Sequence, residues 1–315
     1  MNKVSHESSP LVSGKESIPR IALIGAGGYG ATHLGALERL MKGERARLQA
    51  VAEPRMDAEL QSRLDGLGVT AYSQMSDLLE KEPLDLLAIS TPITFHYAMT
   101  QEALKKGLYI FLEKPPVPLI HQLEGLIQCD VEKKVLVGFH YVNQLIGRQL
   151  KRWMVQGDLG KIKSIRAIFA SPRGSIYYQR ARWAGKMVLN GEPVFDGPMT
   201  NAMSHILNLI LFLGGKSEEE FGVPQEVEGE FYRARAIDSY DTACMRGVFP
   251  SGTTFGFACS HAVENGSAWK FEITGSKGKA WVEEGKVLND QNLSFSFQES
   301  DFEDPKTLNA ILSNK

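Results

Sequence analysis

The chain has 315 residues, 43% hydrophobic and 23% charged, a balance typical of a globular protein with a full core and not of a disordered chain. Its 35 basic and 37 acidic residues leave a net charge of −2, which excludes the strongly basic surface that attracts nucleic acid or an anionic membrane. Three widely spaced cysteines indicate neither a disulfide framework nor a thiolate metal site. We therefore expect a cytoplasmic protein of about two domains without a metal, nucleic-acid or membrane partner.

Residues 1–19 are polar and predict a flexible leader, and from Arg20 short apolar runs alternate with helical stretches. The apolar runs predict strands at Ile21–Ile24, Leu48–Ala52, Leu84–Ile89, Leu108–Leu112 and Val135–Val137. Between them, helical spacing predicts helices at Gly28–Leu40, Met56–Leu67, Met75–Lys81, His96–Lys106 and Pro118–Asp130. This alternation predicts an α/β fold whose first part, residues 20–142, is a doubly wound parallel sheet of the Rossmann type.

From residue 143 to residue 315 the pattern changes, and it predicts an α+β domain with a large, mostly antiparallel sheet covered by helices on one face. The predicted helices are Gln144–Gln156 and Pro198–Leu213. The predicted strands are Ile162–Ala170, Glu228–Arg235, Asp241–Phe249, Thr253–Cys259, Ala268–Thr274 and Gly278–Glu283. Phe297–Lys315 is expected to form a loop and a short helix.

A glycine-rich turn follows the first predicted strand and opens the first helix. It reads Gly25-Ala26-Gly27-Gly28-Tyr29-Gly30, a G-x-G-x-x-G pattern. In this context the first glycine permits the tight turn, the second lets the backbone approach a pyrophosphate, and the third lets helix and strand pack closely. The helix N-terminus then offers N–H groups to the phosphates. The pattern predicts a dinucleotide site, although a glycine-rich turn without a ligand remains the alternative.

Glu53 ends the second predicted strand, 23 positions after Gly30, where a carboxylate can accept hydrogen bonds from the adenosine ribose. A carboxylate there repels a 2′-phosphate and favours NAD over NADP. Arg55 weakens this preference for NAD, because a guanidinium can bind the 2′-phosphate of NADP. Glu53 as a solvated strand end is the alternative interpretation.

Four further motifs occur in order along the chain, and with the glycine turn they resemble the Gfo/Idh/MocA family, the relatives of glucose-fructose oxidoreductase and inositol dehydrogenase. They are Ser90-Thr91-Pro92 with His96, Glu113-Lys114-Pro115, Gly157-Asp158-Leu159-Gly160-Lys161-Ile162, and Ile273-Thr274-Gly275-Ser276-Lys277-Gly278. The resemblance spans about Arg20 to Glu283. It implies that Thr91, Pro92, His96 and Glu113 lie at the nicotinamide side of the cofactor site, and it says little about the substrate.

Lys114 follows the predicted strand Leu108–Leu112 and precedes two prolines. A lysine at the carboxyl end of a parallel strand points into the region where such sheets bind ligands. Its ammonium can contact the cofactor, hydrogen-bond a substrate hydroxyl and stabilise alkoxide character, and the resemblance implies this role. A surface lysine before a Pro-Pro turn is the alternative.

The family's second signature, D-x-x-x-H on a helix, matches His205, but Asn201 stands where the carboxylate is usual. Asn208 likewise replaces the acidic residue that commonly follows the histidine. The resemblance implies that His205 exchanges the proton of the substrate hydroxyl. Asn201 can orient the ring or the substrate but cannot stabilise an imidazolium by charge. A buried core histidine is the other interpretation of His205.

The segment Tyr177–Lys186 is rich in aromatic and cationic residues, a mixture that suits a polyhydroxylated ligand. From it we predict Arg182 and Trp183 as substrate-binding residues, with a subunit contact as the alternative. Tyr141, beside the last predicted parallel strand, is a further substrate-binding candidate.

Together these features predict an NAD-dependent oxidoreductase, with NADP possible, that interconverts a secondary alcohol and a ketone of a sugar, sugar acid or cyclitol. The catalytic candidates are Lys114, His205 and Asn201. Two alternatives stay open: an NAD-dependent glycoside hydrolase that oxidises its substrate transiently, and a nicotinamide-binding sensor or assembly protein with weak chemistry. The resemblance also implies a homodimer or homotetramer through the open face of the second sheet, where Phe255, Phe257 and Trp269 are expected.

Overall fold

A computed structural model describes residues 18–264, 266–283, 286–290 and 294–296. The predicted leader as far as residue 17, and the loop and helix expected at Phe297–Lys315, lie outside the described residues. The chain divides into two compact units, one ending at Ser90 and the other beginning at Thr91. The domain boundary placed between residues 142 and 143 stays a prediction.

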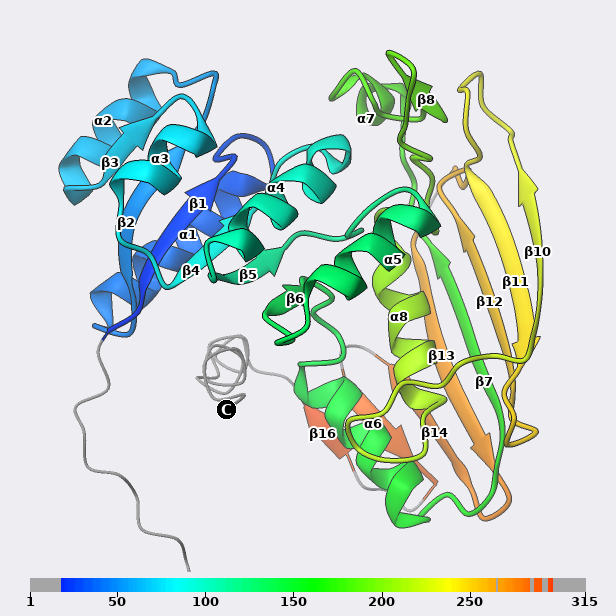
Figure 1. Cartoon of the computed structure of the whole chain (residues 1–315). Coiled ribbons are helices and arrows are strands. Elements are labelled where there is room, and N and C mark those ends of the chain that lie inside the picture. Colours follow the sequence, from blue (N-terminus) through cyan, green and yellow to red (C-terminus); the bar gives the residue numbers. More distant parts are fainter. Residues whose placement is uncertain (1–17, 265, 284–285, 291–293, 297–315) are drawn as a thin grey trace, which may run out of the picture. The chain divides into compact units, whose positions relative to one another are not determined.

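The first unit is a parallel sheet with helices between its strands (Figure 1). Its elements are β1 (Arg20–Ile24), α1 (Gly30–Lys42), β2 (Arg47–Ala52), α2 (Ala58–Leu67), β3 (Thr70–Tyr72), α3 (Met75–Lys81) and β4 (Leu86–Ile89). The strand order is β3-β2-β1-β4, and every pair is parallel. The chain therefore leaves β1 toward β2 and later returns to the opposite side of β1. Such a reversal of strand order is where open parallel sheets bind ligands.

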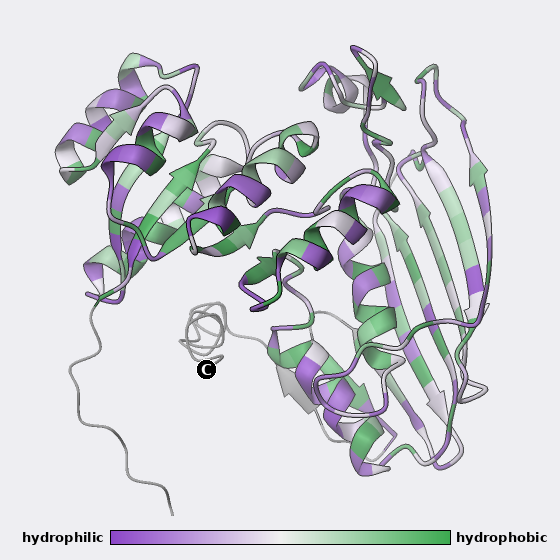
Figure 2. Cartoon of the chain, in the orientation of Figure 1, coloured by the Kyte–Doolittle hydropathy of each residue, from purple (hydrophilic) through white to green (hydrophobic). Residues whose placement is uncertain are grey.

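Burial explains why these runs form strands. Four of the five residues of β1 and all four residues of β4 are buried, as expected for strands covered on both faces. Figure 2 shows β1 as hydrophobic over most of its length. The helices have local signals of their own: Asp57 caps α2 by accepting a hydrogen bond from the Leu60 N–H at 2.8 Å, and Gly68 ends it with a φ of 67°.

The second unit begins with two further helix–strand repeats and continues into a large sheet. The first repeats are α4 (Ile93–Lys105), β5 (Tyr109–Leu112), α5 (Ile120–Cys129) and β6 (Val135–Val137), with β5 and β6 parallel. Then follow α6 (Leu145–Gln156), β7 (Ile162–Ala170), α7 (Ser175–Gln179), β8 (Val188–Leu189), β9 (Glu192–Pro193) and α8 (Ser204–Leu213). The remaining strands are β10 (Glu226–Tyr232), β11 (Thr242–Val248), β12 (Thr254–Ser260), β13 (Ala268–Gly275), β14 (Lys279–Glu283), β15 (Lys286–Asn289) and β16 (Ser294–Ser296).

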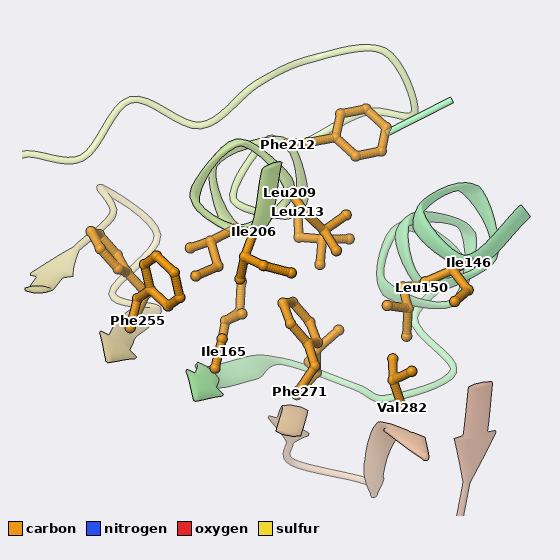
Figure 3. Close-up of a cluster of buried hydrophobic side chains, with 14 of the residues drawn as sticks. Ile146, Leu150, Ile165, Ile206, Leu209, Phe212, Leu213, Phe255, Phe271 and Val282 are labelled. Atoms are coloured by element: carbon orange, nitrogen blue, oxygen red, sulfur yellow. The ribbon is translucent and has the colours of Figure 1, made fainter. Parts of the chain in front are cut away.

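The large sheet has eight strands in the order β10-β11-β12-β7-β13-β14-β15-β16. All neighbours are antiparallel except β12 and β7, because β7 is inserted between strands that come much later in the chain. Helices α6 and α8 pack on one face (Figure 1). Figure 3 shows Leu209 and Leu213 of α8 directed toward Phe271 and Ile165 of the sheet, with Leu150 of α6 beside them. This apolar layer is the core of the second unit.

The fold class predicted from the sequence is confirmed, with two corrections. The helix expected from Pro198 begins only at Ser204, and residues 197–203 form turns. Phe255 and Phe257 do not lie on the open face: they are 3% and 2% exposed and belong to the core beneath the helices. Trp269 is also packed against that core. Side chains alternate between the two faces along a strand, so the open face of the sheet carries residues such as Arg166 and Ile168 of β7, which are exposed.

Candidate active site and cofactor site

The glycine turn of the first unit has the backbone geometry that only glycine supports easily. Gly25 has a φ of 83° and Gly28 a φ of 55°, both in the left-handed region. A Cβ atom added to Gly30 would lie 2.0 Å from the carbonyl oxygen of Gly25, so helix α1 and the end of β1 meet at a distance that excludes any side chain. No side chain caps the start of α1, which follows the exposed Tyr29. The turn therefore fits a pyrophosphate at the helix N-terminus.

Glu53 follows β2 and its carboxylate lies at this turn. One oxygen accepts hydrogen bonds from the N–H groups of Ala26 and Gly27, at 3.0 and 3.1 Å. The other accepts the N–H of Arg55 at 3.0 Å. Glu53 is only 7% exposed, whereas Arg55 is exposed. The structure thus joins the two parts of the predicted dinucleotide site, the glycine turn and the acidic residue, and this arrangement fits the adenosine end of NAD.

His96, expected at the nicotinamide side, is 2% exposed and lies between two backbone segments. Its Nδ1 lies 3.0 Å from the carbonyl oxygen of Pro115 and its Nε2 lies 2.9 Å from that of Thr91. Burial lowers the pKa of His96, and the carbonyl oxygens at its two ring nitrogens oppose that shift. His96 therefore joins the Thr91-Pro92 segment to the turn after β5, where the Lys114–Pro115 peptide bond is cis. At that turn Glu113 is 8% exposed and accepts the N–H of Lys114 at 3.0 Å.

Lys114 meets Asn201 in the second unit. Its ammonium donates to the backbone oxygen and to the side-chain oxygen of Asn201, each at 3.1 Å. Burial lowers the pKa of Lys114, and the negative charges of Glu113 and Asp196 oppose that shift. Asn201 donates in turn from its Nδ2 to Asp196 at 2.7 Å. Lys114 and Asn201, separated by 87 residues, are therefore direct partners, a contact that the sequence analysis did not predict.

His205 is the second residue of α8 and is 9% exposed. Its ring centroid lies 3.8 Å from that of His140 and 5.9 Å from those of Phe139 and Tyr141. Its Nδ1 is buried and has no hydrogen-bond partner among the described residues. Burial, with the nearby His140 and Lys114, lowers the pKa of His205 to about 2, so the ring is neutral. A neutral imidazole with a vacant nitrogen can accept a proton.

Around α7 the structure favours Arg180 over Arg182. The guanidinium of Arg180 lies 3.6 Å from the ring centroid of Tyr177 and 4.6 Å from that of Trp183, and it approaches Asp196 at 3.8 Å. Arg182 is exposed. Tyr141 stacks on Trp269 with ring centroids 6.3 Å apart.

The second unit thus brings together Lys114, Asn201, His205 and Tyr141, and it adds three residues to which the sequence analysis gave no firm role: His140, Arg180 and Asp196. For Asp196 a signal existed, since it is an acidic residue five positions before Asn201. Asn201 does not share a helical face with His205, because it lies in the turns before α8. Its side chain is instead hydrogen-bonded to Lys114 and Asp196.

A strand, a glycine turn, a helix and an acidic residue at the next strand end are the elements of a dinucleotide-binding Rossmann fold. Residues 19–141 match the model of an oxidoreductase family with an NAD-binding Rossmann fold, and residues 148–281 match the Gfo/Idh/MocA C-terminal domain. The chain therefore belongs to the Gfo/Idh/MocA oxidoreductase family, and the predicted nicotinamide cofactor is confirmed.

Curated relatives include an inositol 2-dehydrogenase of Corynebacterium glutamicum, 26% identical over 51% of this chain and 48% of that protein. An uncharacterized oxidoreductase of Synechocystis sp. is 24% identical over 87% of this chain and 72% of that protein. This chain spans about half the length of the inositol dehydrogenases that it matches.

Two solved structures have the same fold. The WlbA dehydrogenase of Bordetella pertussis, in complex with NADH and UDP-GlcNAcA, has a TM-score of 0.76 at 20% identity and covers 95% of this chain and 89% of its own. A myo-inositol 2-dehydrogenase of Lactobacillus plantarum has a TM-score of 0.72 at 21% identity, with the same coverage. No helix among the described residues combines the length and the apolar composition needed to cross a membrane.

Proposed function

We propose that this protein is an NAD-dependent dehydrogenase that oxidises a secondary alcohol of a sugar, sugar acid or cyclitol to the ketone, or catalyses the reverse reaction. The observation that carries the proposal is the partly buried Lys114 ammonium, held by Asn201 in the unit that also holds the neutral His205. Membership of an oxidoreductase family and relatives named inositol 2-dehydrogenase support the same class of reaction.

Lys114 binds the substrate oxygen. An ammonium has three N–H groups, and two of them are directed to the oxygens of Asn201. The third is left for a substrate hydroxyl, whose developing negative charge the ammonium stabilises. NAD, bound at the glycine turn, supplies the hydride acceptor of the reaction.

His205 accepts the proton of the hydroxyl group. Its ring is neutral in the free protein, so it can take a proton during alcohol oxidation and return it during ketone reduction. When the hydroxyl proton moves to His205, the oxygen retains its electron pair and forms the carbonyl as the C–H bond breaks.

Arg180, Tyr177 and Trp183 are the residues that we assign to the rest of the substrate. Aromatic faces stack on the apolar face of a sugar ring, and a guanidinium hydrogen-bonds hydroxyls or a carboxylate. This assignment replaces the predicted Arg182 by Arg180, two positions earlier, and keeps Trp183. At the other end of the cofactor, the buried carboxylate of Glu53 favours NAD over NADP.

The test is the absorbance of reduced nicotinamide when the protein, NAD and a pooled panel of sugars, sugar acids and cyclitols are mixed. Lys114→Ala is expected to leave NADH affinity within about tenfold and to lower turnover by about a hundredfold or more. Lys106→Ala, which removes an exposed lysine at the end of α4, is the matched control and should retain full activity.

Equal activity in wild type and Lys114→Ala would contradict the role of Lys114. If the protein binds NADH but no substrate gives a signal, the hydrolase with internal cofactor recycling or the sensor becomes the better explanation. Release of a leaving group from glycosides in the same panel, without net change in NADH, would identify the hydrolase.

A further inference from the structure

Asp196 is a buried carboxylate next to the candidate active site. Its residue is 6% exposed, and it lies in the segment between β9 and α8. One carboxylate oxygen accepts the Nδ2 hydrogen of Asn201 at 2.7 Å, and the other accepts the N–H of Gly185 at 2.7 Å. The guanidinium of Arg180 lies 3.8 Å from the second oxygen. A buried carboxylate is costly unless it is paired in this way.

The chemistry of the partners fixes the direction of the Asn201 amide. The Asp196 carboxylate can only accept hydrogen bonds, so the NH₂ group of Asn201 must face it. The oxygen of the same amide then faces Lys114, whose ammonium can only donate. Lys114 therefore donates to the Asn201 amide oxygen, and the Asn201 amide nitrogen donates to Asp196. Exchanging the oxygen and the nitrogen of the amide would break both hydrogen bonds.

We infer that Asp196 is the positioning carboxylate of the Lys114 site, acting through the amide of Asn201. It holds Asn201 with its oxygen toward Lys114 and places a negative charge one residue away from the ammonium. This inference rests on the proposed function for its kinetic consequences. Because it acts through Asn201, we treat Asp196 as a positioning residue and not as a catalytic one.

Asp196 reaches Lys114 only through the Asn201 amide, so its negative charge acts on the ammonium without a direct ion pair. A carboxylate at position 201 would form an ion pair with Lys114, whereas the amide oxygen binds it without a full charge. Glu113 and, after it, Asp196 favour the charged form of Lys114, against the effects of burial and of the Arg180 guanidinium, which lower its pKa. Two N–H groups of the ammonium are directed to Asn201, and one is left for a substrate oxygen.

The test compares Asp196→Asn, Asn201→Asp and the double variant that exchanges the two residues. Asp196→Asn keeps the shape but removes the charge and one of the two acceptor oxygens, so it can no longer accept from both Asn201 and Gly185. We expect kcat to fall at least about tenfold and the alkaline limb of the pH profile to move to lower pH. Asn201→Asp places two carboxyl groups within hydrogen-bond distance, and one of them must then be protonated. The exchange variant restores one carboxylate and one amide and should recover to within about fivefold of wild type.

A second measurement does not depend on activity. The rate at which acetic anhydride modifies Lys114, followed by mass spectrometry over a range of pH, reports its titration in the protein without substrate. The midpoint should be lower in Asp196→Asn than in wild type. In the exchange variant it should be at or above the wild-type value, because the carboxylate at position 201 then pairs directly with the ammonium. Asp238→Asn is the control, since Asp238 is an exposed acid whose salt bridge is with Lys186, at 3.5 Å.

An unchanged midpoint and an unchanged kcat in a folded Asp196→Asn protein would overturn the inference and leave Asp196 as a packing residue of its loop. If Asp196→Asn does not fold, failure of the exchange variant to restore the Lys114 midpoint would overturn it equally. A shifted midpoint in a protein without dehydrogenase activity would instead contradict the proposed function and leave the arrangement around Lys114 in place.

Discussion

At the scale of single residues, Glu53 has two tasks that a substitution can separate. Its carboxylate accepts three backbone N–H groups at the glycine turn, and it is placed to accept the ribose hydroxyls of NAD. Glu53→Ala removes both the acceptor and the charge, so the preference for NAD over NADP should fall about tenfold or more, and the free energy of unfolding by about 1–3 kcal/mol.

Glu53→Gln is the matched control, because it keeps an oxygen acceptor but has no charge. It should retain most of the stability and still lose much of the discrimination against the 2′-phosphate. Fluorescence titration with NADH and NADPH measures the ratio of affinities without requiring a substrate. An unchanged ratio in both variants would mean that Glu53 does not reach the ribose.

At the scale of elements, a lysine of α6 joins that helix to the end of α8. Lys151 is 1% exposed, and its ammonium donates to the carbonyl oxygens of Phe212, Gly215 and Glu220 at 2.6, 2.8 and 2.9 Å. Burial lowers the pKa of Lys151 to about 8. The last carbonyl groups of a helix lack intrahelical hydrogen-bond donors, and the Lys151 ammonium donates to the one of Phe212 and to two carbonyl groups that follow α8.

Lys151→Met fits the apolar surroundings but leaves these buried carbonyls without a donor. We expect the free energy of unfolding to fall by about 2–4 kcal/mol, measured by urea denaturation. Arg152→Met changes the exposed neighbour on the same helix and should stay within about 0.5 kcal/mol of wild type. Equal effects of the two substitutions would show that the carbonyl contacts of Lys151 contribute nothing.

The elements also show where sequence patterns suffice. Buried strands such as β4 are continuous apolar runs, and α6 ends at Gly157 with a φ of 80°, so both could be predicted from local signals. The start of α8 at Ser204, and not at Pro198, could not be predicted from local signals. Thr200 donates its N–H to the Tyr240 hydroxyl at 3.2 Å, and a Cβ on Gly197 would lie 2.2 Å from that ring. These contacts come from residues about 40 positions away, and they shape the segment that holds Asn201.

The same reasoning applies to the candidate site. Lys114 and His205 could be predicted because the resemblance marks their positions, but the partners of Lys114 depend on tertiary structure. Arg180 and Arg182 are two positions apart in the turns that follow α7, and no periodic pattern distinguishes the one that stacks on Trp183. Asp196 could be recognised as a partner only when its distance to Asn201 was known.

At the scale of the whole molecule, four histidines of the second unit have lowered pKa values: the buried His96, His205 and His261, and His140, an exposed residue whose ring lies against that of His205. Burial lowers the pKa of each, to about 2 in His205 and about 4 in His261. In the unfolded chain a histidine titrates near 6.5, so between pH 6.5 and the folded pKa the unfolded state binds more protons than the folded state. The stability that these histidines contribute is therefore fully present above about pH 6.5, and it is lost as the pH falls toward their pKa values in the folded protein.

Each such histidine contributes a slope of at most about 1.4 kcal/mol per pH unit, and four of them should make acid unfolding steep between pH 6 and pH 4. Urea denaturation over that range measures the slope. His261→Gln keeps a hydrogen-bonding group for the Tyr178 hydroxyl, which lies 3.2 Å from the His261 Nδ1, and should reduce the slope by the share of one histidine. His121→Gln, on the exposed side of α5, should leave it unchanged. If His261→Gln has the wild-type slope, the His261 ring binds as many protons in the folded protein as in the unfolded chain, and His261 contributes nothing to the acid sensitivity.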